Sequence, residues 1–197
     1  TSNILGRVTG GTLSTIDGTI QTTGFGSANL FLMNPSGIVL GPGASLNVGG
    51  SVSFTTAQYL RLFDGVNSAI FFANPASDGL ANSILTINPS AFEFLSASPA
   101  AYGFLTAPDP NATMTVQGNL LKVPEGRALS LVGGDITIQS GILGDGTTQA
   151  ANLQAPGGQI NLVSVASPGE VRLSNFQPTP NINGASFTTM GTVTAVR

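Results

Sequence analysis

The side chains that most often carry out acid–base, nucleophilic or metal chemistry are rare in this sequence. It contains no histidine and no cysteine, which removes the commonest general base, thiol nucleophiles, disulfides and most transition-metal ligands. Carboxylates are then the groups left to form a catalytic pair of the kind that cleaves polysaccharides. They are Asp17, Asp64, Asp78, Asp109, Asp135, Asp145, Glu93, Glu125 and Glu170.

The spacing of these carboxylates favours turns over catalysis. No two lie within two residues of each other, and Asp17, Asp64, Asp78 and Asp145 each precede glycine, as Asp does in tight turns. Acids on neighbouring coils of a solenoid could still converge, which spacing alone does not reveal. The segment 133–135 (Gly-Gly-Asp) is only a weak match to a calcium-binding repeat. We therefore expect no enzymatic activity, no bound metal and no cofactor.

Charge is sparse, and the basic residues are scattered. Charged residues make up 8% of the chain, with six Lys and Arg, nine Asp and Glu, and a net charge of -3. Binding to phosphates needs clustered Lys and Arg, so nucleic acid is not an expected partner. No apolar run is long enough for a membrane-spanning helix. Because the chain opens without Met or a basic leader, we expect a piece of a longer or processed protein.

Short strands must position the remaining polar residues. Apolar residues alternate with Thr, Ser, Asn and Gln in runs bounded by Gly, Asn, Asp or Pro, a pattern that predicts β-strands. No long window has the spacing of an amphipathic helix. The predicted strands cover residues 18–22, 28–33, 44–48, 114–117, 128–132, 135–139, 159–165 and 191–196.

Two architectures fit many short strands: an antiparallel sandwich and a parallel solenoid. A Gly-x-x-apolar pattern returns at Gly118, Gly134 and Gly158, at spacings of about one coil, which favours the solenoid. Asn-Gly pairs typical of hairpins are scarce, and Asp-Gly pairs suit hairpins and solenoid corners alike. We predict an all-β fold, a right-handed parallel β-helix that forms a single domain over residues 1–197.

The stretch from residue 59 to about 105 breaks the rhythm of the strands. It holds eight of the chain's thirteen Phe and Tyr residues and several Asn-Pro and Ser-Pro junctions. We interpret residues 59–110 as an extra-helical insertion, a short strand pair or a helix laid against one flank of the solenoid. The aromatic side chains would cover that flank; a platform for a ligand is the alternative reading.

The first third of the chain carries a set of motifs within residues 3–57: Asn3–Gly11, Ser14–Ile20, Ala28–Val39 and Leu46–Gly50. These resemble the haemagglutination-activity domain of filamentous haemagglutinin-like adhesins, which are exported by two-partner secretion. The family signature, Asn-Pro-Asn-Gly-Ile, corresponds here to Asn34, Pro35, Ser36, Gly37 and Ile38, with Ser36 in place of the usual Asn. The family's N-terminal cap and its Asn-Pro-Asn-Leu motif lie upstream of the matched run. We thus expect the domain to be truncated at its N-terminus, with an uncapped coil.

The resemblance implies that residues 34–38 are a secretion motif read by an outer-membrane β-barrel transporter. It also implies a secretion-recognition and scaffold domain of a large surface adhesin, exported unfolded and folded outside the cell. The expected location is secreted, extracellular or on the bacterial surface. From the residues alone, the motif predicts a β-helix corner, since Pro35 fixes φ and lacks an N–H. Corner and recognition are compatible readings.

Two alternative functions remain open. Uncapped ends expose strand edges, so a self-assembling solenoid could form extracellular filaments by end-to-end association. A polysaccharide-binding or polysaccharide-cleaving β-helix is the lesser alternative. In the adhesin reading, a host-cell, matrix or carbohydrate receptor would be the partner of the parent protein.

Overall fold

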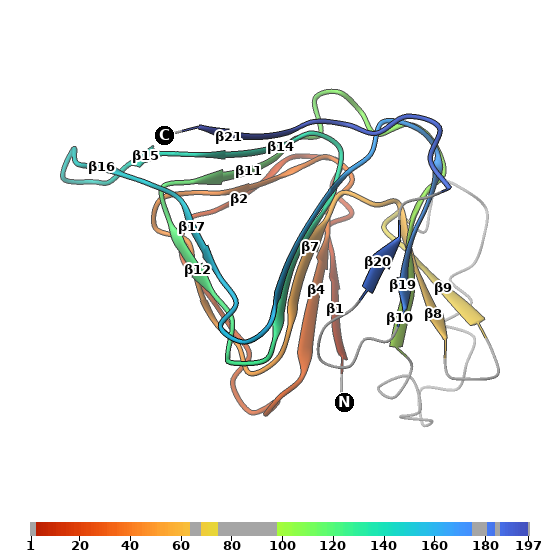
Figure 1. Ribbon diagram of the computed structural model, residues 1–197, viewed down its shortest axis with the longest axis horizontal. Helices are drawn as coiled ribbons and strands as arrows, with labels where there is room; N and C mark the ends of the chain where they lie inside the picture. The colour runs from red at the N-terminus through yellow and green to blue at the C-terminus, as the bar shows by residue number, and fades with distance from the viewer. Residues whose placement is uncertain (1–2, 64–67, 75–97, 175–180, 184–185, 197) are drawn as a thin grey trace.

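The chain winds around a triangular column, which Figure 1 shows end-on. The structure is a computed structural model, and it describes residues 3–63, 68–74, 98–174, 181–183 and 186–196. Within these residues all regular structure is β, and the sheets that form the faces of the column are parallel. The described residues include no helix of the length and hydrophobicity needed to cross a membrane.

The column has three faces, which are formed by parallel sheets, and the chain visits the faces in turn (Figure 1). The first face comprises β1 (Asn3–Arg7), β4 (Asn29–Met33), β7 (Val52–Thr55), β13 (Ala128–Gly133) and β18 (Gln159–Ser164). The second comprises β2 (Ser14–Ile16), β5 (Ile38–Leu40), β11 (Met114–Gln117), β14 (Ile136–Gln139) and β21 (Val193–Val196). The third comprises the pairs β3 (Thr19–Gln21) with β6 (Ser45–Asn47) and β12 (Leu120–Lys122) with β17 (Asn152–Gln154).

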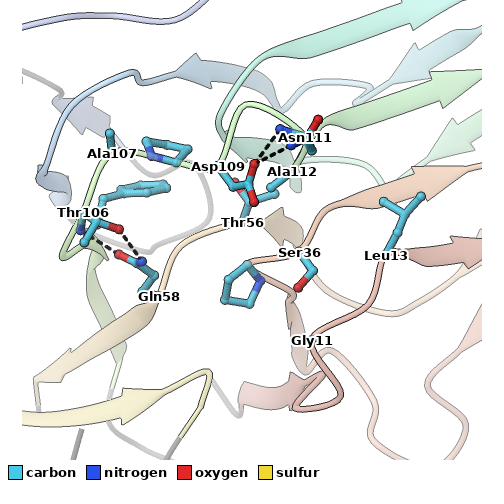
Figure 2. Close-up of a pocket in the computed structure, with 13 residues that line it drawn as sticks. Gly11, Leu13, Ser36, Thr56, Gln58, Thr106, Ala107, Asp109, Asn111 and Ala112 are labelled. Atoms are coloured by element: carbon cyan, nitrogen blue, oxygen red, sulfur yellow. Dashed lines mark hydrogen bonds between the residues drawn. The ribbon is translucent and has the colours of Figure 1, made fainter. Parts of the chain in front are cut away.

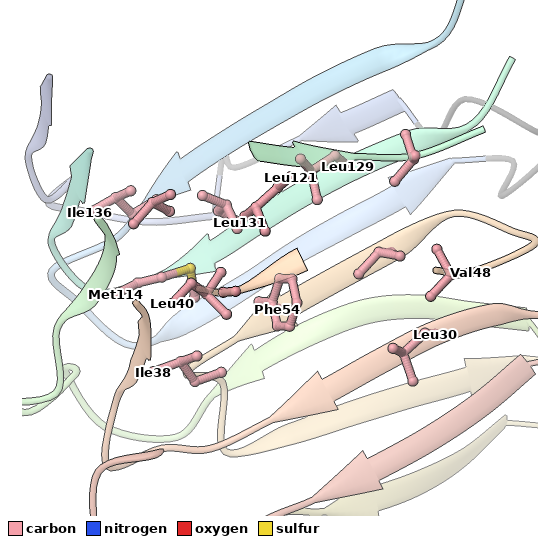
Figure 3. Close-up of a cluster of buried hydrophobic side chains, with 14 residues drawn as sticks. Leu30, Ile38, Leu40, Val48, Phe54, Met114, Leu121, Leu129, Leu131 and Ile136 are labelled. Carbon is pink, nitrogen blue, oxygen red and sulfur yellow. The ribbon is translucent and has the colours of Figure 1, made fainter. Parts of the chain in front are cut away.

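Aliphatic side chains from successive coils stack inside the column. On the first face Leu30 pairs with Val52, and Val52 with Leu129, so that side chains of one kind lie above one another. Period-two alternation places every second residue of each strand on this inner side. Figure 3 shows the resulting core, in which Phe54, Ile38, Met114 and Leu131 are fully buried. The parallel β-helix predicted from the sequence is therefore confirmed; its right-handed sense stays a prediction.

A five-stranded antiparallel sheet outside the column covers the outer side of the first face (Figure 1). Its order is β20 (Asn181–Asn183), β19 (Gly169–Ser174), β10 (Ser98–Phe104), β8 (Tyr59–Phe63) and β9 (Ser68–Phe72). Outward-facing residues of the column, among them Phe31, Met33 and Val132, pack against Leu60 and Tyr102 in a core of their own. This explains why β13 is buried along its whole length: both of its faces are covered.

The antiparallel sheet is built from two separate excursions of the chain. The first leaves the column after β7 and returns before β11, and its described strands are β8, β9 and β10. This range contains the predicted insertion 59–110, of which residues 64–67 and 75–97 lie outside the described residues. The second excursion, with β19 and β20, was not predicted. It leaves after β18 and returns before β21.

One detail of the sequence prediction was wrong. The glycines Gly118, Gly134 and Gly158 do not mark the same point of successive coils: they precede β12, β14 and β18, which lie on three different faces. Each glycine therefore marks a different corner. Of the two readings left open for the Asp-Gly pairs, Asp145-Gly146 takes the hairpin: it joins the antiparallel strands β15 (Gly141–Ile142) and β16 (Thr148–Gln149), and Gly146 has φ +83°.

Candidate functional site

The predicted motif forms the corner at which the chain passes from β4 on the first face to β5 on the second. The Gly37 N–H donates to the Asn34 carbonyl oxygen at 3.1 Å and closes a tight turn. The Ser36 N–H donates to Oδ1 of Asn34 at 2.9 Å, which stabilises the same turn from the side chain. Pro35 has no backbone N–H, so it can occupy the middle of the turn without leaving a hydrogen-bond donor unpaired.

The side chain of Asn34 ties this corner to the preceding coil. Its Nδ2 donates to the Thr12 carbonyl oxygen and to Oγ of Ser14, both at 2.8 Å. Asn34 has 0% of its surface exposed. A buried amide without partners would cost about 1–3 kcal/mol, but here both ends of the amide are hydrogen-bonded. The side chain therefore fixes the relative position of two coils.

The backbone of the corner ties it to the following coil. The Asn34 N–H donates to the Thr55 carbonyl oxygen at 2.9 Å, and the Ile38 N–H donates to the Thr113 carbonyl oxygen at 3.0 Å. Thr55 ends the strand from which the first excursion departs, and Thr113 immediately precedes the strand to which it returns. The motif is thus hydrogen-bonded to the residue before the first excursion and to the residue after it.

Gly37 and Ile38 are suited to their places for steric and hydrophobic reasons. Gly37 has φ +107°, and a Cβ at this position would lie 2.9 Å from the Thr113 carbonyl oxygen and 2.7 Å from Cδ1 of Leu13. Any larger residue would have to displace the next coil. Ile38 points into the column, is fully buried and belongs to the core shown in Figure 3.

Pro35 and Ser36 are the half-buried members of the motif, and they line a pocket. The pocket has a volume of about 490 Å³ and lies between the corner and the returning segment 104–112 of the first excursion. In Figure 2, Asp109 and Asn111 lie on the side opposite Ser36, with Thr56 between them. The motif therefore has a buried part, which joins coils, and an exposed part, which faces this pocket.

A family model described as TPS secretion domain matches residues 1–196. The chain belongs to the TPS secretion domain family. Searches among curated proteins and among solved structures gave no match. As a TPS domain the chain is a substrate of two-partner secretion: it is exported, and its partner is an outer-membrane transporter. The resemblance drawn from residues 3–57 is thereby confirmed.

The carboxylates of this TPS domain hold turns and loops. Oxygens of Asp17 and Asp135 accept the backbone N–H groups of Gly43 and Thr192, at 2.6 and 2.8 Å. Asp109 and Asp145 accept the N–H two residues later in the chain. Asp64, Asp78 and Glu93 lie outside the described residues. The described part of the chain contains no group of three or more carboxylates placed to hold a metal ion.

One cluster of charged and phenolic groups lies on the antiparallel sheet. Glu170 pairs with Arg61 and accepts a 2.8 Å hydrogen bond from the hydroxyl of Tyr59. Burial, together with this bond to a carboxylate, raises the pKa of Tyr59 to about 12. On the same sheet, burial raises the pKa of Tyr102, whose hydroxyl lies 2.5 Å from Oγ of Ser53 on the column. These contacts join the two excursions to each other and to the first face.

Sequence reasoning missed a second structural asparagine of the TPS domain. Nδ2 of Asn119 donates to the carbonyl oxygens of Leu40 and Gly41 at 2.8 and 2.9 Å, and the residue is fully buried. It joins the third coil to the second at the next corner of the triangle. Its position directly after Gly118, between two strands, indicates a turn, but its burial depends on contacts with residues far away in the sequence. Asn119 provides a natural comparison for Asn34.

Proposed function

We propose that this TPS domain is the secretion-recognition and scaffold domain of a large surface adhesin. It crosses the outer membrane unfolded, its transporter reads the segment Asn34–Ile38 in that state, and the β-helix forms outside the cell. The observation that carries this proposal is the complete burial of Asn34 and Ile38 in the folded domain. A partner could contact these two side chains only before the corner has formed.

The geometry of the corner supports a link between recognition and folding. Its hydrogen bonds reach back to Thr12 and Ser14 and forward to Thr55 and Thr113. Once these hydrogen bonds form, the side chains of Asn34 and Ile38 are buried and a partner can no longer contact them. Folding would therefore favour release from the transporter. Each completed coil then offers a strand edge to the next coil, as in other solenoids. The absence of cysteine also fits passage of an unfolded chain, because no disulfide can close a loop prematurely.

The contacts of three of the described acids support a non-enzymatic role. Asp17 and Asp135 stabilise backbone turns, and Glu170 is held by Arg61 and Tyr59. A polysaccharide-cleaving site needs paired carboxylates facing a substrate cleft. These three acids instead face structural partners, which favours a scaffold over a catalyst.

Secretion of the parent protein together with its transporter tests the proposal. The variant Asn34→Ala is compared with Asn119→Ala, because each removes an Nδ2 group that donates two hydrogen bonds at a buried corner. We expect export to fall several-fold for Asn34→Ala and to remain near the wild-type level for Asn119→Ala. Refolding of both purified variants from urea measures the effect on folding separately. Equal export of the two variants, or unchanged export after deletion of residues 34–38, would exclude recognition of the motif.

The second candidate function, self-assembly, is favoured by the ends of the column. In the described residues, β2 and β3 end two faces on one side, and β17, β18 and β21 end the faces on the other, each pairing with a single neighbouring strand. Such edges can pair with another copy. Light scattering after size-exclusion chromatography at rising concentration distinguishes the cases: filaments would grow with concentration, whereas a constant monomer mass would remove this candidate.

A further inference from the structure

The pocket beside the motif has the size and position of a ligand site. Its volume of about 490 Å³ lies within the range usual for small-molecule sites, roughly 300–1,000 Å³. One wall is the corner of the column and the other is the loop through which the first excursion returns (Figure 2). The loop wall is anchored, since Gln58 accepts the N–H groups of Leu105 and Thr106 and donates to Oγ1 of Thr106.

The lining offers hydroxyl, amide and carboxylate groups with unused hydrogen-bonding capacity. Oδ1 of Asp109 accepts from Asn111, while its second carboxylate oxygen has no partner among the described residues. The hydroxyl of Ser36 likewise makes no hydrogen bond within the described part of the chain. Thr106 is exposed, uses its hydroxyl oxygen as an acceptor and retains a proton to donate, whereas Thr56 is buried and its hydroxyl oxygen accepts the Gly134 N–H. The lining therefore offers both donors and acceptors to a ligand.

The charge of the pocket lining disfavours anionic ligands. Asp109 is the one charged residue among those that line the pocket, and the lining includes neither Lys nor Arg. An anionic ligand would be repelled by this carboxylate without compensation. A free carboxylate oxygen without a basic neighbour suits a neutral donor such as an alcohol. The side chains of Leu13, Pro35 and Pro108 add apolar surface beside these polar groups.

An extended peptide fits the pocket less well than a polyol. Strand-like peptide binding depends on free backbone N–H groups at a sheet edge. Here the N–H groups of Leu105 and Thr106 are bound by Gln58, and those of Asn111 and Ala112 by Asp109. The groups that remain available are side-chain hydroxyls, an amide and a carboxylate.

We infer that this pocket binds a neutral sugar residue. The free oxygen of Asp109 and the side chain of Asn111 bind ring hydroxyls from one side, and Ser36 binds them from the other. The C–H face of the sugar rests against Leu13 and Pro35. The site belongs to the folded domain outside the cell, so it is independent of how the unfolded chain is exported. It would give the domain a direct contact with surface glycans.

Heteronuclear NMR on the isotope-labelled 19.8 kDa domain tests the inference. The probes are glucose, galactose, mannose and N-acetylglucosamine, with sialic acid as the anionic comparison. We expect at least one neutral sugar, and not sialic acid, to shift the amide signals of Ser36 and of the non-proline residues within 104–112. Asp109→Asn should weaken that binding by about ten-fold or more, which corresponds to about 1.4 kcal/mol.

Asp145→Asn is the matched control, because Asp145 accepts the N–H two residues later as Asp109 does but lies in the exposed hairpin. It should bind the sugar with wild-type affinity. The inference is overturned if no neutral sugar shifts these signals at about 10 mM, a concentration that reveals binding with a Kd in the millimolar range. It is also overturned if sialic acid binds equally well, or if Asp109→Asn and Asp145→Asn have the same effect.

Discussion

The backbone N–H of Asn34 donates a 2.9 Å hydrogen bond to the carbonyl oxygen of Thr55. Asn34 belongs to the second coil of the column, and Thr55 is the last residue of β7 in the third, where the chain leaves for its first excursion. On the other side of the same corner, Ile38 binds Thr113, where the excursion returns. The two ends of the first excursion are thus hydrogen-bonded to one short turn that lies earlier in the sequence.

Replacement of Asn34 by Ala should destabilise the folded domain. The change removes two donated bonds, to Thr12 and Ser14, and one accepted bond, from Ser36, in a fully buried position. We expect a loss of about 2–4 kcal/mol in the free energy of unfolding, at about 1 kcal/mol per bond plus the cost of unpaired groups. Urea unfolding followed by circular dichroism measures it, and a change below about 0.5 kcal/mol would contradict the role assigned to this side chain.

Replacement of Gly37 by Ala should be costly for two separable reasons. The residue has φ +107°, and the new Cβ would lie 2.9 Å from a backbone oxygen of the next coil. Gly24 is the control, because it has φ +82° but open space around the position of a Cβ. We expect Gly24→Ala to cost about 1 kcal/mol from backbone strain alone, and Gly37→Ala to cost at least about 2 kcal/mol more. Equal melting temperatures for the two variants would show that the contact with Thr113 relaxes freely.

A substitution at Gly103 tests whether the antiparallel sheet can be destabilised separately from the column. The ring of Tyr59 lies over this glycine so closely that an added Cβ would come within 1.8 Å of its Cζ. Gly103→Ala should therefore displace Tyr59, break its bond to Glu170 and cost about 1–3 kcal/mol. Hydrogen exchange should accelerate in β8, β10 and β19 and change little in β5 and β14.

The control for this variant is Gly144→Ala, which has open space around the added Cβ and should have exchange rates like the wild type. If Gly103→Ala instead accelerates exchange equally in all sheets, the column and the antiparallel sheet unfold as one unit, and the prediction of separate behaviour is wrong.

The domain should lose stability in alkali. The pKa of Tyr59 is raised from 10 to about 12 by burial and by Glu170, so folding favours the neutral phenol. This contribution is fully present below pH of about 10 and is lost as pH rises through about 12. Tyr102, whose pKa burial also raises, acts in the same direction.

The free energy of unfolding between pH of about 9 and 12, with tyrosinate absorbance followed in parallel, measures this effect. Tyr59→Phe should show a shallower decline than the wild type. Because the chain has no histidine, stability between pH of about 6 and 8 should be nearly constant. An unchanged alkaline slope in Tyr59→Phe would assign the decline to other groups.

The sequence identified the column well and its outer layer poorly. Alternating apolar and small polar residues, as in Met114–Gln117, report directly on one buried and one exposed strand face, and these strands were confirmed. In β13, by contrast, both faces are buried, because a layer from distant parts of the chain covers its outer side. Pairing between β10 and β19 depends on contacts far apart in the sequence, which no local pattern encodes.

The candidate site was predictable only where local sequence patterns determine its structure. Pro35 and Gly37 carry local turn signals, so the corner could be placed from the residues alone. That Asn34 would lie below Thr55, or that Pro35 and Ser36 would face segment 104–112, depends on where the first excursion leaves and returns. Asn119 had a usable signal beside Gly118, but nothing distinguished it from a surface turn.

The pairing of β10 with β19 has a consequence for the proposed export of an unfolded chain. Residues 101–104 pair with residues 169–172, which would leave the transporter much later if the N-terminus led. Until then, β10 has β8 on one side and unsatisfied backbone groups on the other. Two chains emerging side by side could fill that gap with each other's β19, which would give a domain-swapped dimer. Spacing between neighbouring transporters would then decide whether single or intertwined molecules reach the surface.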